Sequence, residues 1–263
     1  MILDDILARK VRQLAEEKQQ YPMTAMQEAA EQCQRTVLDF PGALAQEGVQ
    51  IIAEVKRASP SKGLICQDFQ PTQIAREYAA AGAAAVSVLT EKHFFQGDDA
   101  YLQGIREQVA LPLLRKDFIL DGYQVYQARV IGADAILLIA AALDDKQLDT
   151  LLELADSLGL HCLVEVHNEL ELQRVLNFDV KVIGINNRNL HTFEVSLQHT
   201  AALRPLIPDG IRLVSESGIH SRDDMIQLAE WGVDAVLVGE SLMRAPSIAE
   251  KIQELRGGDH DRG

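Results

Sequence analysis

Long charged or amide side chains follow the ends of several short apolar runs in this 263-residue sequence. The group comprises Glu54, Lys56, Lys116, Glu165, Asn186, Arg188 and Glu216. Carboxylates and lysines transfer protons in general acid–base catalysis, and a lysine also stabilises a developing alkoxide. Side chains two positions apart in a strand share one face, so Ile52, Glu54 and Lys56 point the same way. The pattern predicts acid–base groups collected at the ends of strands.

Eight apolar runs carry these groups, and amphipathic stretches of helical period lie between them. The runs span residues 49–55, 84–89, 111–114, 135–139, 161–166, 181–185, 211–214 and 235–238. Continuous rather than alternating apolar strands are typical of a parallel sheet that is buried on both faces. Eight strand–helix units in about 210 residues favour a closed (β/α)8 TIM barrel. A doubly wound open sheet is the alternative, and the absence of a GxGxxG fingerprint weighs against it.

The chain outside the barrel units is short and helical in pattern. We expect a single domain, 1–263, made of an N-terminal helical extension over the barrel mouth (1–48), the barrel (49–255) and a frayed tail (256–263). Thr24 and Gln27 fit a capping box at the start of a second helix. Gly82, Gly132 and Gly232 each precede a strand within a repeated motif, where a glycine can end a helix.

In a parallel barrel the active site lies at the carboxyl ends of the strands, and a phosphate often binds after strands seven and eight. There the sequence has Ser217, Gly218 and Gly239, which allow close backbone approach to an anion. Lys56 and Ser59 belong to a basic loop at 56–63, which is either a flexible surface loop or, in the interpretation that we prefer, a mobile lid over an anionic substrate. Phe95 and Phe118 are candidates for an aromatic-lined pocket. The residues alone predict a phosphate-binding barrel enzyme.

The amino-acid composition excludes several classes of binding partner and several cellular locations. With 25 Lys and Arg against 39 Asp and Glu, the net charge of −14 disfavours nucleic-acid binding. No apolar run approaches the roughly 20 residues of a membrane span, and the acidic N-terminus does not resemble a signal peptide. Three widely spaced cysteines fit reduced thiols and a cytoplasmic location. The seven histidines show no metal-ligand spacing, so we assign no metal and interpret them as core or surface residues.

Seven motifs at these sites resemble those of the indole-3-glycerol-phosphate synthase family. They are IAEVKRASPSKG at 52–63, SVLTE with FFQG at 87–97, LRKDFI at 114–119, LVEVH at 163–167, IGINNRNL at 183–190, SESGI at 215–219 and VGESLMR at 238–244. The resemblance spans roughly residues 50–245, and a helical N-terminal extension is also a family feature. It implies the conversion of 1-(2-carboxyphenylamino)-1-deoxyribulose 5-phosphate into indole-3-glycerol phosphate, carbon dioxide and water, without a cofactor.

The resemblance also implies residue roles. Lys116 resembles the general acid of ring closure, Glu165 the group that handles protons in dehydration, and Lys56 a contact to the substrate carboxylate or phosphate. Glu54, Asn186, Arg188 and Glu216 resemble residues that orient the substrate and the lysine. Ser59, Ser217, Gly218, Gly239 and the backbone N–H of Glu240 resemble the phosphate site, and Phe95, Phe118 and Leu137 resemble the walls around the anthranilate ring.

Two alternatives stand beside this interpretation. One is another phosphosugar barrel enzyme, for example a phosphoribosylanthranilate isomerase, which leaves the two strand-end lysines unexplained. The other is a non-enzymatic binding protein, which the presence of both Lys116 and Glu165 disfavours. We expect a small phosphorylated molecule as the partner, with no nucleic acid, no membrane and no fused isomerase domain.

Overall fold

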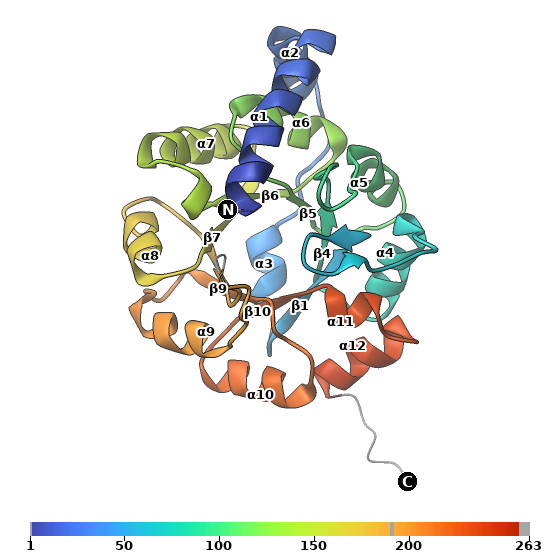
Figure 1. The fold of residues 1–263 in the computed structure, drawn as a ribbon, viewed down its shortest axis with the longest axis vertical. Helices are drawn as coiled ribbons and strands as arrows, with labels where there is room; N and C mark the ends of the chain where they lie inside the picture. Colours follow the sequence, from blue (N-terminus) through green and yellow to red (C-terminus); the bar gives the residue numbers. More distant parts are fainter. Residues whose placement is uncertain (1, 190–191, 258–263) are drawn as a thin grey trace.

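The computed structural model describes residues 2–189 and 192–257, and its centre is a closed barrel of eight parallel strands (Figure 1). The strands are β1 (Gln50–Val55), β4 (Ala85–Leu89), β5 (Leu113–Lys116), β6 (Ala135–Ile139), β7 (His161–Val166), β8 (Val182–Asn186), β9 (Arg212–Glu216) and β10 (Ala235–Val238). Each pairs with the next along the chain, and β1 closes the ring by pairing with both β4 and β10. The predicted (β/α)8 barrel is confirmed.

Helices surround the barrel and return the chain from each strand to the next (Figure 1). They are α4 (Pro71–Ala80), α5 (Asp99–Arg106), α6 (Gly122–Ile131), α7 (Asp145–Ser157), α8 (Glu169–Val175), α9 (Gln198–Leu203), α10 (Arg222–Glu230), α11 (Glu240–Met243) and α12 (Ile248–Arg256), with 3-10 turns at Ala140–Ala142 and Arg204–Leu206. Within the described part of the chain, no helix combines the length and the apolarity needed to cross a bilayer.

Strands β5 and β9 each end two residues later than the apolar pattern predicts. The run at 111–114 begins with Leu111-Pro112, and because proline lacks an amide N–H the strand β5 starts only at Leu113. It then continues to Lys116, which is in register with Leu89 of β4. In the same way β9 extends to Glu216, which pairs with β8 and β10. The charged residues are therefore part of the hydrogen-bonded barrel and not of its loops.

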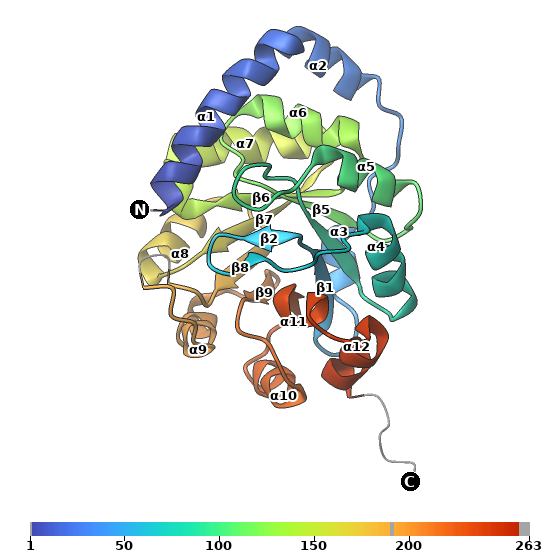
Figure 2. The same ribbon diagram turned by 45° about the vertical axis from the view of Figure 1, so that its right-hand side comes forward.

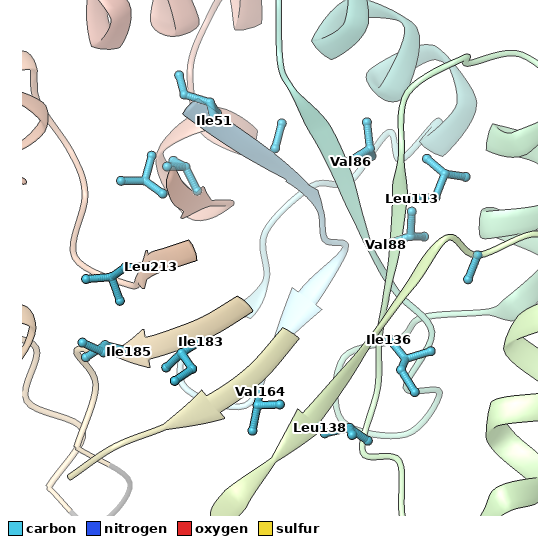
Figure 3. Packing of buried hydrophobic residues seen from close by; sticks show 14 of the residues in the cluster. Ile51, Val86, Val88, Leu113, Ile136, Leu138, Val164, Ile183, Ile185 and Leu213 are labelled. Atoms are coloured by element: carbon cyan, nitrogen blue, oxygen red, sulfur yellow. The ribbon is translucent and has the colours of Figure 1, made fainter. Parts of the chain in front are cut away.

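Side chains alternate between the barrel interior and the helix layer, as the strand parity predicts. Ile52, Leu114 and Leu163 belong to the cluster inside the barrel. The neighbouring residues point outward and pack beneath the helices in a much larger core (Figure 3). Ten of these outward residues are labelled there: Ile51, Val86, Val88, Leu113, Ile136, Leu138, Val164, Ile183, Ile185 and Leu213. This second layer fixes the barrel against its helices.

The N-terminal extension contacts the barrel at both ends and along one side (Figure 2). Helix α1 (Ile2–Gln20) reaches the mouth, where its Lys10 pairs with Asp117 in a 2.7 Å ion pair that is almost fully buried. Helix α2 (Met23–Glu31) packs along α6. Helix α3 (Phe40–Leu44) closes the opposite end, and its Phe40 and Leu44 are fully buried in the interior cluster.

Details at the chain's two ends differ from the sequence pattern. Helix α2 begins at Met23 after Pro22, without a side-chain cap, so the capping box predicted at Thr24 is wrong. A proline residue directly before a helix already holds extended backbone there, and Gln27 donates instead to the Tyr126 hydroxyl at 3.3 Å. At the other end, Arg256 closes α12 and donates to the carbonyl of Gly82, whereas residues 258–263 of the expected tail lie outside the described residues.

The repeated glycine motif joins helices to strands in the expected way, and its aspartates differ in surroundings. Gly132 and Gly232 both have positive φ, 97° and 75°. Asp134 is fully buried: its two oxygens accept from Arg35, Arg106, Leu38 N and Leu113 N at 2.5–2.9 Å. Asp234, with 22% of its side chain exposed, accepts from Arg212 and Leu213 N, both at 2.8 Å.

Replacing these aspartates should therefore have unequal costs. Asp134→Ala leaves two guanidinium groups without their shared carboxylate and should lower the free energy of unfolding by about 3–5 kcal/mol. Asp234→Ala, the matched control from the same motif, should cost about 1–2 kcal/mol. Urea unfolding followed by circular dichroism measures both. Equal losses would contradict the view that burial makes the difference.

Candidate active site

A cavity of about 430 Å³ opens at the carboxyl ends of the barrel strands. All fifteen residues that the sequence singled out line it: Glu54, Lys56, Ser59, Phe95, Lys116, Phe118, Leu137, Glu165, Asn186, Arg188, Glu216, Ser217, Gly218, Gly239 and Glu240. They come from the eight barrel strands or from the segments that follow them. Strand parity and fold position selected thirteen of them, and the family resemblance added Leu137 and Glu240.

Lys116 lies between two carboxylates. Its Nζ is 2.7 Å from Glu216 Oε2 and 3.6 Å from Glu165 Oε2, with 17% of the lysine side chain exposed to the cavity. Burial by itself lowers the pKa of this lysine, but the negative charges of Glu216 and Glu165 outweigh it and raise the pKa above the usual value. The lysine is therefore an ammonium ion, a potential proton donor that faces the cavity.

The two carboxylates have opposite shifts. Burial, together with the negative charge of Glu165, raises the pKa of Glu216 to about 7 despite the nearby Lys116. Burial acts in the same direction on Glu165, yet the contact with His167 and the charge of Lys116 outweigh it and lower its pKa to about 2. Near neutral pH the site therefore offers one ionised carboxylate and one that exchanges a proton readily, an arrangement suited to acid–base chemistry.

A second lysine–carboxylate pair lies at the end of β1. Lys56 Nζ forms a close ion pair with Glu54 Oε2, and the Glu54 side chain is only 3% exposed. The backbone here is held from outside the barrel, because the buried Tyr78 hydroxyl donates to the carbonyl of Glu54 at 3.0 Å. A Cβ atom at Gly239 would lie 2.2 Å from Glu54 Oε2. Glycine at this position thus leaves room for the carboxylate.

The loop after β9 has unusual backbone geometry next to the cavity. Ser217 and Gly218 both have positive φ, 68° and 84°, a region that a serine adopts only at a cost. The Ser217 hydroxyl donates to Asn186 Oδ1 at 3.0 Å, and the same oxygen accepts from the Arg188 amide at 3.0 Å. Asn186 thereby joins the loops after β8 and β9 at the rim of the cavity.

Aromatic side chains form one wall of the cavity. The rings of Phe95 and Phe118 are tilted by 38° with their centroids 6.2 Å apart. The loop that presents Phe95 is organised by Glu91, a buried carboxylate that accepts from the amides of His93, Phe94 and Phe95 at 2.6–3.0 Å. This wall provides a flat apolar surface beside the charged groups, which suits an aromatic ring.

Sequence reasoning missed several cavity residues. Ile2, Leu3 and Ile6 of α1 line the mouth, and only the helical period of the first residues hinted at a buried face. His167 also lines it, although the spacing of the histidines gave no reason to select one. Gly184 on β8 faces Glu216, where a Cβ would lie 2.3 Å from Oε1. Its place two residues before Asn186, on the same strand face, was the available signal.

A closed (β/α)8 barrel with ammonium and carboxylate groups at its strand ends defines a barrel enzyme that performs acid–base chemistry on a small molecule. Solved structures with this fold include thiamine phosphate pyrophosphorylase from Pyrococcus furiosus (TM-score 0.62, 16% identity, 83% of this chain and 96% of that one). Another is 3-hexulose-6-phosphate synthase from Salmonella typhimurium (TM-score 0.60, 13% identity, 80% and 97%). At such identities the likeness concerns the fold alone.

Sequence comparison identifies the particular enzyme family. The family model for indole-3-glycerol phosphate synthase matches residues 3–255. Curated proteins of that name are 49% identical over 259 residues in Alkaliphilus metalliredigens, and 50% identical over 258 residues in Acetivibrio thermocellus. These alignments cover 97–98% of this chain and 99% of each relative. The chain belongs to the indole-3-glycerol phosphate synthase family.

The activity follows from the family. It is a carboxy-lyase reaction of tryptophan biosynthesis, in which 1-(2-carboxyphenylamino)-1-deoxyribulose 5-phosphate undergoes ring closure, decarboxylation and dehydration to indole-3-glycerol phosphate. The comparisons do not favour the alternative of a phosphoribosylanthranilate isomerase.

The contact at Gly184 gives a first test of the site. Gly184→Ala should displace the Glu216 carboxylate, and with it Lys116, because the new methyl group occupies the place of Oε1. A displacement of this size should lower kcat by about 100-fold. Gly104→Ala on α5, where the new Cβ would lie 3.4 Å from Thr72 Oγ1, is the matched control and should keep its activity. Wild-type turnover in Gly184→Ala would show that the Glu216 position is unimportant.

Proposed function

We propose that Lys116 is the general acid of ring closure. The observation that supports this most strongly is its ammonium group, which faces the cavity between Glu165 and Glu216. As the aromatic carbon bearing the carboxylate attacks the ketone, negative charge develops on the ketone oxygen. A nearby ammonium stabilises that charge and can donate its proton. Glu216 then remains as the closest group from which the lysine is reprotonated.

We assign the later proton transfers to Glu165, an ionised carboxylate on the opposite side of Lys116. Dehydration removes the former ketone oxygen as water and a proton from the neighbouring carbon, so it needs both an acid and a base. Glu54, Asn186 and Glu216 are assigned to orienting these groups. Glu54 does so through its pair with Lys56, which we place against the substrate carboxylate or phosphate.

We assign the phosphate, the carboxylate and the aromatic ring of the substrate to different walls of the cavity. We assign the phosphate to Ser59, Ser217, Gly218, Gly239 and the backbone N–H of Glu240, all of which line the cavity. Arg188 is assigned to the substrate carboxylate before it leaves as carbon dioxide. Phe95, Phe118 and Leu137 are assigned to the anthranilate ring, an arrangement supported by the paired phenylalanine rings.

We further propose a cytoplasmic location. Cys33, Cys66 and Cys162 are all free thiols, as expected of a reducing compartment. Ring closure is the one activity that we assign to this chain, because the matched family model takes up residues 3–255.

The direct test mixes the purified protein with the carboxyphenylamino-deoxyribulose phosphate and follows indole fluorescence without added metal. Growth of the signal is expected. A folded protein that binds the substrate without producing the signal would overturn the proposed roles while leaving the binding assignments intact.

Lys116→Ala tests the acid. We expect kcat to fall by about 10²–10⁴-fold, the usual contribution of a positioned general acid, with a nearly unchanged fold by circular dichroism. Lys146→Ala, at an exposed position of α7, is the control and should turn over like the wild type. Near-wild-type turnover in a folded Lys116→Ala protein would assign the acid to another group.

Ser217→Ala tests the phosphate assignment. A hydroxyl contact to phosphate is shared by ground and transition states, so its loss should raise KM roughly tenfold, or about 1.4 kcal/mol, and leave kcat almost unchanged. Ser157→Ala on α7, whose hydroxyl donates to a helix carbonyl, serves as the control. If kcat fell at constant KM, Ser217 would act in the chemical steps instead.

A further inference from the structure

A chain of charged groups leads from the cavity toward the outside along β7 and α8. His167 Nε2 lies 3.2 Å from Glu165 Oε1, and on the other side of the ring Nδ1 lies 3.2 Å from Glu171 Oε2. The imidazole is therefore flanked by a carboxylate at each nitrogen. His167 follows Glu165 by two residues and shares its strand face, which brings the ring to the edge of the cavity.

The carboxylate of Glu171, which lies farther from the cavity, is itself held in place by hydrogen bonds. Glu171 Oε2 also accepts from the backbone amide of His167 at 2.8 Å, and Oε1 accepts from Asn168 Nδ2 at 2.7 Å. Asn168 caps the start of α8 by accepting from the Glu171 amide at 3.0 Å. The position of the imidazole is thus fixed by the first turn of a helix, independently of the substrate.

Two further groups influence the carboxylate of Glu165, which lines the cavity. Lys116 lies 3.6 Å from Glu165 Oε2, and the Asn186 side chain also lowers the pKa of Glu165. Burial by itself disfavours a charged imidazole, but Glu165 and Glu171 outweigh it and raise the pKa of His167 to about 10. At neutral pH the ring is therefore a buried cation between two anions, and both of its nitrogens carry protons.

We propose that His167 is a positioning residue for the reaction: its imidazolium engages Oε1 of Glu165, keeps that carboxylate ionised and leaves Oε2 directed toward Lys116. This inference rests on the role proposed above for Glu165. His167 acts through Glu165 and not on the substrate, and Glu171 in turn orients the ring. No spacing of histidines in the sequence indicates such a role, since the two partners come from the strand and from the following helix.

The inference has a consequence for pH dependence. The contact with His167 lowers the pKa of Glu165, so the ionised form persists far into acid in the wild type. When the imidazolium is removed, this pKa rises toward the ordinary value of 4.5 or above. Since a carboxylate loses its charge as pH falls through its pKa, turnover of the variant must decline at higher pH than turnover of the wild type.

The experiment compares His167→Asn, Glu171→Gln and the control His199→Asn on α9 in kcat and KM profiles between pH 4 and 8. For His167→Asn we expect kcat to be about tenfold lower at neutral pH, KM within about twofold, and an acidic limb that enters the scanned range near pH 4.5 or above, whereas the wild-type limb set by Glu165 lies below that range. Glu171→Gln should move the limb in the same direction by less, and His199→Asn should not move it.

Two results separate this inference from the proposed function. A His167→Asn profile that superimposes on the wild-type profile after scaling would overturn the positioning role, because a purely structural defect lowers the amplitude without moving the limb. Should His167→Asn fail to fold, an unmoved limb in Glu171→Gln overturns the role equally. Full activity in Glu165→Gln would instead overturn the proposed function. In the Glu165→Gln background, adding His167→Asn should cause no further loss of turnover.

Discussion

The alternation of side chains along parallel strands is the constraint on which the site depends. Inside the barrel, Ile52 and Leu114 form the packed lower layers, and one step further along the same strand faces stand Glu54 and Lys116. A buried charge is tolerated only where an opposite charge or hydrogen-bonding group accompanies it. The barrel satisfies this requirement by bringing strand ends of opposite charge together, so that each charged group at the cavity is accompanied by a group of opposite charge.

The resulting charges alternate in sign across the mouth. From the helix layer inward the order is Glu171, His167, Glu165, Lys116 and Glu216, with neighbouring groups 2.7–3.6 Å apart. Each cation lies between two anions, which offsets part of the cost of removing it from water. Lys56 differs, because its ion pair within the described part of the chain is with Glu54 and because it begins a loop that lines the cavity. The two lysines are thus unequally constrained.

Much of this arrangement could be predicted from the sequence, and the remainder has a common physical origin. The eight strands and their inward faces follow from local apolar runs and parity, and most of the fifteen cavity residues follow from their places at the strand ends, whereas Leu137 and Glu240 were selected only through the family resemblance. What escaped prediction depends on segments distant in the chain: the Lys10–Asp117 pair, the closure of the lower barrel by Phe40, and the contact of Gly184 with Glu216. A local pattern reports which face a residue occupies but not which distant side chain it meets there.

The extension's attachment points bear on how the chain folds during synthesis. Lys18 pairs with Asp121, Gln27 with Tyr126 and Leu38 N with Asp134, at separations of 103, 99 and 96 residues. At about 5–20 residues per second, the first helices therefore leave the ribosome roughly 5–20 s before their partners exist. Through that interval the apolar faces of α1 and α3 have no barrel to cover. The segment that is made first must dock late, and its exposed faces are natural binding sites for chaperones while the barrel is completed.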